Sequence, residues 1–196
     1  MMKRHLAAAA IALGSLATIA GTAEAQAATI ASPFHAGQWG VEAYAHVFGD
    51  GGVMRFFTPR TALVLDVAAD QISTDANDAI SSLRHTSSTM LNLSLGLRHH
   101  TMVAPKIAST FAGGVSVSTT RQRSEYEAPS GTSVSSYRAN YAGGWVEFGG
   151  QYMVADRFAV GLAYDLIGRH ISNTGTDQHG FEFATQFRPI RATLYF

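Results

Sequence analysis

Apolar and polar residues alternate one by one along much of this chain, and this period of two constrains its fold more than any other feature. Four leucines occupy alternate positions of residues 89–99: Leu91, Leu93, Leu95 and Leu97. The positions between and after them carry polar or small residues: Asn92, Ser94, Gly96 and Arg98. Because successive side chains of a β-strand point to opposite sides, this pattern predicts a strand with one apolar and one polar face.

The same alternation recurs in stretches of about ten residues along the rest of the chain. Turn-rich segments separate them, and no helical period competes. We expect eight strands, at about 37–48, 53–57, 62–71, 88–99, 107–119, 139–153, 157–171 and 180–196. Pro189 in the last stretch indicates a bulge or a change in the alternation. The expected fold is therefore all-β, an up-and-down meander of eight antiparallel strands that closes into a transmembrane barrel.

The expected connections alternate in length. Those near Pro59, near Pro105 and at 155–156 are short, whereas 71–87 and 119–138 are long and polar. Short turns at one end and longer loops at the other are typical of outer-membrane barrels. The 119–138 segment also carries Arg121, Arg123 and Arg138. Solvated loop charge is the simpler interpretation of these arginines, and contact with lipopolysaccharide phosphates or a partner is the alternative.

The first 25 residues have the features of a secretory signal. The basic Lys3-Arg4-His5 precedes an alanine-rich apolar run that extends to Ala20, and Ala23-Glu24-Ala25 fits a cleavage site, as does Ala25-Gln26-Ala27. The apolar run is too short to make a good membrane-spanning helix. We therefore expect residues 1–25 to be removed and residues 26–196 to form one barrel domain.

The composition excludes several classes of function. The chain has no cysteine, so disulfides, thiolate metal sites and a lipid anchor on cysteine are absent. Loss of Lys3, Arg4 and Glu24 takes 14 basic and 14 acidic residues to 12 and 13. With nearly equal numbers of basic and acidic residues, the chain lacks the excess positive charge that proteins use to bind nucleic acid. We expect neither a metal nor a cofactor.

The last five residues, Ala192-Thr193-Leu194-Tyr195-Phe196, alternate and end on an aromatic residue. This ending resembles the C-terminal signature of small bacterial outer-membrane β-barrel proteins. The segment from Val53 to Leu63 is similar to the second and third strands of the generic eight-stranded members. The resemblance implies insertion by the barrel-assembly machinery, a place in the bacterial outer membrane, and contact with its lipid and lipopolysaccharide. We expect a monomer.

An eight-stranded barrel has an interior that side chains can fill. The alternation turns seven charged residues inward: Glu42, Asp66, Arg98, Glu147, Asp165, Arg169 and Arg191. Carboxylates and guanidinium groups together predict a paired network that plugs the lumen, and a conduit for ions is the alternative. The outward face carries aromatic residues suited to membrane interfaces: Trp39, Phe111, Phe148, Tyr152, Phe158, Tyr164 and Phe196.

One segment suggests chemistry. His170, Ser172 and Asn173 are followed by Glu182, and the pattern resembles the motif of outer-membrane lipid A 3-O-deacylases. The resemblance implies His170 as base, Ser172 as nucleophile and Glu182 as the acid that orients the histidine. A polar hairpin rim is the simpler interpretation.

The sequence thus favours a structural or surface-interaction barrel without catalysis. A lipid A 3-O-deacylase-like esterase is the first alternative. The second is an exported soluble β-barrel or sandwich that binds a ligand, with the aromatic and leucine rows as its core.

Overall fold

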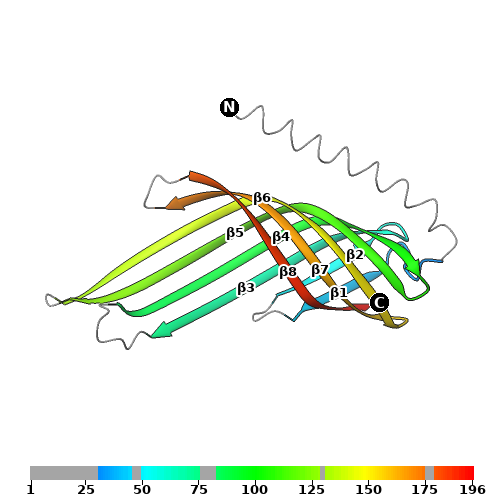
Figure 1. Cartoon of the computed structure of the whole chain (residues 1–196), viewed down its shortest axis with the longest axis horizontal. Helices are drawn as coiled ribbons and strands as arrows, with labels where there is room; N and C mark the ends of the chain where they lie inside the picture. The colour runs from blue at the N-terminus through cyan, green and yellow to red at the C-terminus, as the bar shows by residue number, and fades with distance from the viewer. Residues whose placement is uncertain (1–30, 46–49, 76–82, 129–130, 175–178) are drawn as a thin grey trace, which may run out of the picture.

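Eight antiparallel strands form a closed ring in the computed structural model, which describes residues 31–45, 50–75, 83–128, 131–174 and 179–196 (Figure 1). In chain order they are β1 (Trp39–Tyr44), β2 (Asp50–Phe56), β3 (Thr61–Asp75), β4 (Leu83–Ala104), β5 (Ile107–Ala128), β6 (Gly131–Ala155), β7 (Phe158–Thr174) and β8 (His179–Tyr195). Each strand pairs with its neighbour in sequence, and β1 pairs with β8. The expected eight-stranded meander is confirmed, whereas the expected signal at 1–25 lies outside the described residues.

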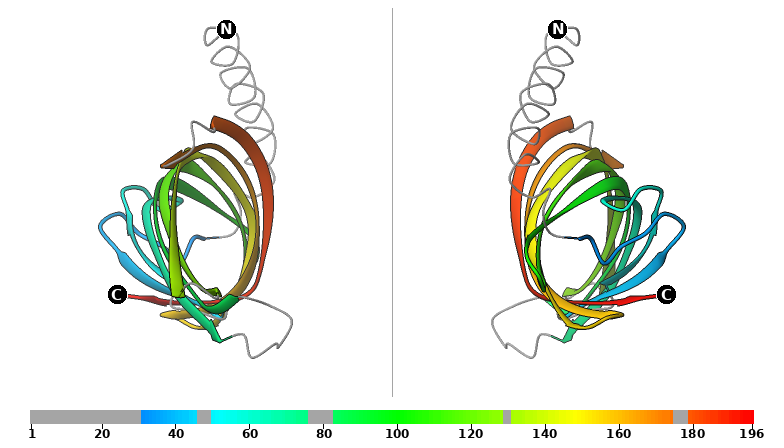
Figure 2. Two further views of the ribbon diagram at one scale, coloured as in Figure 1. Left: turned by 90° about the vertical axis from the view of Figure 1, so that its left-hand side faces the viewer. Right: turned by 90° about the vertical axis from the view of Figure 1, so that its right-hand side faces the viewer.

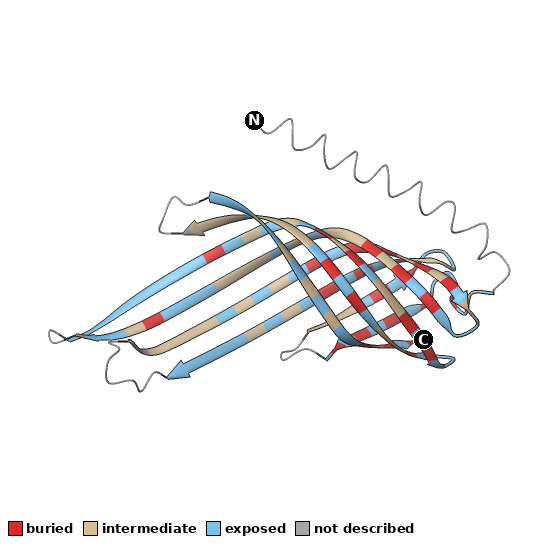
Figure 3. Ribbon diagram, viewed as in Figure 1, coloured by how far each residue is buried: buried red, intermediate tan, exposed pale blue. Residues whose placement is uncertain are grey.

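The sequence alternation becomes an alternation of exposure around the ring. The four leucines at positions 91 to 97 of β4 are 44–51% exposed on the outside, whereas Ser94 and Arg98 between and after them are buried inside. β1 repeats the pattern, with Val41 exposed and Glu42 buried. Buried residues gather toward the end of the barrel where β8 finishes (Figure 3). The barrel therefore has an apolar outside and a polar inside.

The two ends of the barrel differ. The end with the short β2–β3, β4–β5 and β6–β7 connections, called the turn end here, also holds the start of β1 and the end of β8. At the opposite end, the loop end, the expected long loops are largely strand. Pairing of β5 with β6 continues to Ala128 and Gly131, and pairing of β3 with β4 continues to Asp75 and His85. Polar residues on both faces of these tips hide the apolar alternation that marks a strand in sequence.

β1 and β2 are much shorter than the strands that flank them. β1 stops pairing with β8 at Tyr44 and Arg191, and β2 stops pairing with β3 at Asp50 and Ala68. In the described part of the chain, no strand covers the β2-facing edge of β3 or the β1-facing edge of β8 toward the loop end. The ring is therefore closed only toward the turn end, and β3 to β8 continue past it as an open, curved sheet (Figure 2).

A bulge interrupts β8 at Pro189. Gly161 pairs with Arg191 and Ala163 pairs with Arg188, so Leu162 of β7 lies opposite two residues of β8. Proline has no N–H for the ladder, which makes it suited to a bulge. The expected change of alternation is confirmed, and it turns Arg188 as well as Arg191 toward the inside.

The segment before β1 closes the turn end of the lumen. Gly37 N donates to Phe56 O (2.7 Å), and Phe56 N donates to Gln38 O (2.8 Å), which fixes the segment against β2. Phe34 is thereby buried, with its ring stacked on that of Phe56 at a centroid distance of 4.9 Å. His100 and Tyr195 complete the cluster around Phe34, at 4.9 and 5.1 Å. Apolar packing therefore seals this end.

Replacement of Phe34 by alanine tests this seal. We expect the free energy of unfolding to fall by about 2 kcal/mol, the cost of leaving one large apolar side chain unburied. Denaturant unfolding of the folded protein in detergent measures it, with exposed Phe57→Ala as the control. Equal stability losses for the two variants would contradict the burial of Phe34.

In the described part of the chain, no helix is long and apolar enough to cross a membrane.

Candidate functional site

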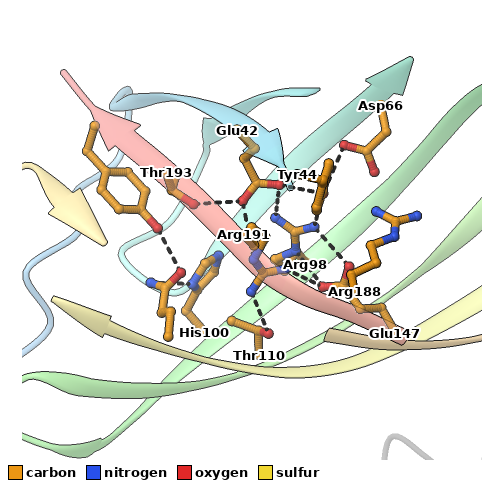
Figure 4. Close-up of polar contacts among 12 residues, drawn as sticks. Glu42, Tyr44, Asp66, Arg98, His100, Thr110, Glu147, Arg188, Arg191 and Thr193 are labelled. Carbon is orange, nitrogen blue, oxygen red and sulfur yellow. Dashed lines mark hydrogen bonds and ion pairs between the residues drawn. The ribbon is translucent and has the colours of Figure 1, made fainter. Parts of the chain in front are cut away.

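Four charged side chains from four strands form a ring in the middle of the lumen (Figure 4). Arg98 Nη1 donates to Glu42 Oε2 (2.6 Å) and Arg98 Nη2 donates to Glu147 Oε2 (3.2 Å). Arg191 Nη1 donates to Glu147 Oε1 (2.7 Å), and its Nε lies 3.8 Å from Glu42 Oε1. All four residues are at most 2% exposed. Carboxylates and guanidinium groups therefore alternate around a closed ring of four side chains, Glu42, Arg98, Glu147 and Arg191, called the central ring here.

Three hydroxyl groups add hydrogen bonds to the central ring. Tyr44 and Thr193 donate to the two oxygens of Glu42, at 2.9 and 3.1 Å. Arg191 Nη2 donates to Thr110 Oγ1 at 3.1 Å. Burying an ion is costly unless it is paired and hydrogen-bonded, so these contacts are what make four buried charges tolerable.

A second group lies on the loop-end side of the central ring. Arg188 Nε is 2.8 Å from Asp165 Oδ2, and the guanidinium carbon lies 4.5 Å from the centre of the Tyr44 ring. The Tyr44 hydroxyl lies 3.4 Å from Asp66 Oδ1. The ring and this group together contain four carboxylates and three guanidinium groups: Glu42, Asp66, Glu147 and Asp165 against Arg98, Arg188 and Arg191.

Arg169 does not join these residues, although the sequence placed it among them. It lies on the inner face farther toward the loop end, where its Nε donates to Glu182 Oε1 at 2.7 Å. Arg188 takes the expected position instead. Alternation alone does not predict this exchange, because counting back from Arg191 turns Arg188 outward unless the length of the Pro189 bulge is known.

The inward residues of β4 show the order of the layers. Ser94 borders a cavity of about 120 Å³, Arg98 belongs to the central ring, and His100 packs in the aromatic cluster at the turn end. Asp66, Asp165 and Arg188 also line the cavity. The central ring and the aromatic cluster therefore lie between this cavity and the turn end.

The structure separates the three residues of the possible esterase site. Glu182 pairs across the β7–β8 hairpin with Arg169, whereas His170 pairs with Phe181. Paired residues share a face and sequence neighbours do not, so His170 and Ser172 point outward and Glu182 points inward. The ring of His170 lies against that of His179, at 5.8 Å. The expected arrangement is thus wrong: Glu182 holds Arg169 and cannot orient His170.

Substitution of Glu182 by glutamine should have a small effect. The Arg169–Glu182 pair is about one-third exposed, and exposed pairs contribute roughly 0–1 kcal/mol. We expect the free energy of unfolding to fall by less than about 1 kcal/mol, as measured by denaturant titration. Arg169→Gln should give a slightly larger loss, since it removes the same pair and also the contact of the guanidinium carbon with the Tyr141 ring, 4.3 Å from the ring centre. A loss of several kcal/mol would show that this pair belongs to the buried network after all.

Six of the seven aromatic residues expected at the membrane interfaces lie on the outer surface, 37–59% exposed: Trp39, Phe148, Tyr152, Phe158, Tyr164 and Phe196. Phe111 joins them by pairing with Phe148, their rings 5.2 Å apart. Among the described residues, no group of three or more histidine, aspartate or glutamate side chains is placed to hold a metal ion.

Besides Arg188, the sequence did not identify Phe34, Tyr44 and His100 as residues of the lumen. Phe34 precedes every strand, so no alternation identifies it. Tyr44 and His100 have the inward parity of Glu42 and Arg98 on the same strands, and that parity was the available signal.

No protein-family model and no curated protein matches the sequence. Among solved structures, the chain is similar to the N-terminal β-barrel domain of OprF from Pseudomonas aeruginosa, with 14% identity, a TM-score of 0.38, and coverage of 82% of this chain and 98% of that one. It is also similar to Ail, the attachment invasion locus protein of Yersinia pestis, with 8% identity and a TM-score of 0.39; the match covers 82% of this chain and 99% of Ail. A third similar structure is CarO2 of Acinetobacter baumannii, with 10% identity and a TM-score of 0.42; the match covers 81% of this chain and 97% of CarO2. Similarity at this level carries no information about what the chain binds or does.

Proposed function

We propose that this chain is an integral protein of the bacterial outer membrane, a barrel with a side-chain-packed lumen and a structural or surface-interaction role. One observation carries the proposal: the distribution of polar and apolar side chains is inverted. Arg98 and Arg191 are the largest fully buried side chains, whereas the leucine row of β4 is about half exposed. A protein folded in water rarely exposes so continuous an apolar surface.

The height of the apolar surface fits a membrane. On β5 the outward apolar positions run from Ile107 to Val117. At about 3.3 Å per residue, and with the strand tilt of about 40° that is usual for barrels, this run spans about 25 Å. That is the height of the apolar band of outer-membrane barrels. The outward aromatic residues supply the amphipathic rings that favour the headgroup regions.

The interior supports a plug rather than a conduit. The central ring fills the middle of the lumen with four paired charges, and Phe34 closes the turn end. An ion crossing the barrel would have to displace both. We therefore assign the interior to stability, and the surface role to the strands that project beyond the apolar band.

A place in the outer membrane also implies a route of export and a set of partners. The N-terminal 25 residues direct export, the barrel-assembly machinery inserts the chain as a monomer, and membrane lipid and lipopolysaccharide surround it. No observation favours lipid A ester hydrolysis, because Glu182 and His170 lie on opposite faces of the sheet.

Cell fractionation tests the proposal. The full chain is produced in a bacterium with two membranes, which is then separated into periplasm, inner membrane and outer membrane. We expect the protein in the outer membrane, released by detergent but not by alkaline carbonate. Recovery from the periplasm in buffer without detergent would overturn the proposal and support the soluble ligand-binding alternative.

A further inference from the structure

Two arginines face each other on the outer surface of the β5–β6 hairpin. Arg121 and Arg138 are direct cross-strand partners, and they continue the outward parity of Val115 and Val117 without any register shift between these strands. Both side chains are exposed, and neither makes a hydrogen bond or ion pair with a described residue. Like charges directly opposite on a sheet destabilise it. A negative group from outside the chain would therefore stabilise the pair.

The residues around this pair do not neutralise it. Toward the apolar band lie Thr119 and Asn140, joined by a 3.0 Å hydrogen bond. On the other side, Arg123 is already paired with Glu125 at 3.0 Å. The nearest carboxylate on β5 is thus engaged, and the closest polar neighbours are a hydroxyl and an amide. Among the described residues, the surface thus offers two unpaired guanidinium groups beside neutral hydrogen-bonding side chains.

The height of the pair points to the kind of anion. Arg121 follows Val117, the last outward valine of β5, by four residues. With a rise of about 3.3 Å per residue and a tilt of about 40°, it lies roughly 10 Å beyond the apolar band. Arginine side chains can extend back along an apolar surface from such a position. Both guanidinium groups therefore reach the level of lipid headgroups.

We propose that Arg121 and Arg138 bind the phosphomonoester headgroup of a lipid in the leaflet that surrounds the loop end. Planar guanidinium groups match phosphate oxygens with two parallel hydrogen bonds. A phosphomonoester carries a charge of about −1.5 to −2 near neutral pH, which balances two arginines. This inference rests on the proposed membrane barrel and names one contact that the barrel makes with its lipid.

Competition between lipids tests the site. Wild-type protein and the double variant Arg121→Gln/Arg138→Gln are reconstituted into phosphatidylcholine bilayers containing a trace of spin-labelled phosphatidic acid or spin-labelled phosphatidylcholine. The motionally restricted fraction of each label gives its relative association with the protein. Because each arginine near the surface contributes about 1 kcal/mol, we expect the wild-type preference for phosphatidic acid to fall by roughly tenfold or more in the double variant.

Arg123→Gln is the matched control, since Glu125 already neutralises Arg123, and it should change the preference by less than about twofold. Equal loss in the control, or an unchanged preference in the double variant, overturns the site. The measurement is then repeated with inorganic phosphate in the buffer, and with chloride at the same ionic strength as the control. Loss of the lipid preference at millimolar phosphate would assign the pair to free phosphate and overturn the lipid assignment.

Insertion is measured separately, by protease protection in pure phosphatidylcholine bilayers. Failure of the wild-type chain to insert would contradict the proposed function. Normal insertion with equal association of both lipids would contradict the phosphate site alone.

Discussion

Replacement of Arg98 by alanine should lower the free energy of unfolding by about 3–5 kcal/mol, the usual cost of removing one partner of a buried ion pair. Arg98 is fully buried and contacts both Glu42 and Glu147. Without it, Arg191 alone remains to compensate two buried carboxylates. Urea unfolding of the reconstituted barrel measures the loss, and Arg157→Ala, at an exposed position of the β6–β7 turn, should stay within about 0.5 kcal/mol of wild type.

Two further measurements separate a structural network from a conduit. A double-mutant cycle with Arg98→Met and Glu42→Gln should show a coupling energy in the range of about 0.5–3 kcal/mol, because the two side chains share one network. Conductance across a planar bilayer should not change while the barrel stays folded. A large rise in conductance for a stably folded Arg98→Ala barrel would contradict the plug and restore the ion conduit.

Substitution of Leu97 by arginine should have the other large effect. Leu97 lies in the exposed leucine row of β4 and pairs with Leu63, which is also outward and exposed, and with Gly113 near the middle of the apolar run of β5. A membrane around this surface would place the new charge near the centre of the bilayer. We expect a loss of about 2–4 kcal/mol in the free energy of folding into lipid, the cost of a lipid-facing arginine near the midplane.

The same change in a water-soluble protein would be nearly neutral, since exposed substitutions usually fall within about 0.5 kcal/mol. Gln71→Arg is the matched control, because Gln71 has the same outward parity on β3 but lies toward the loop end of the leucine row. Equilibrium folding into lipid vesicles gives both values. Similar small losses for Leu97→Arg and Gln71→Arg would show that no lipid surrounds the leucine row.

The central ring was predictable because each member lies within a strand of regular alternation. Glu42, Arg98 and Glu147 follow the parity of apolar neighbours on their own strands, and the face of such a residue can be inferred without knowing its partners. Arg188 was not predictable, because its face depends on how many residues the Pro189 bulge contains. A single added residue reverses the face of every residue beyond it.

Contacts across a hairpin were harder to infer. The partner of Glu182 depends on the register of β7 with β8, and the sequence shows only that both segments alternate. His170 and Arg169 were equally near in sequence, and the register selected Arg169. The position of Phe34 depends on how the segment before β1 folds back over β2, which no local pattern encodes.

The short β1–β2 hairpin gives the two halves of the barrel different mechanical properties. Toward the turn end, every strand has two neighbours, so loosening one strand breaks backbone ladders on both of its sides. Beyond Ala68 of β3 and Arg191 of β8, each of these two strands is held from one side only. Local opening is easiest where fewest backbone hydrogen bonds must break. Fraying therefore starts at these two borders, and the projecting sheet can flex while the charged interior below it stays rigid.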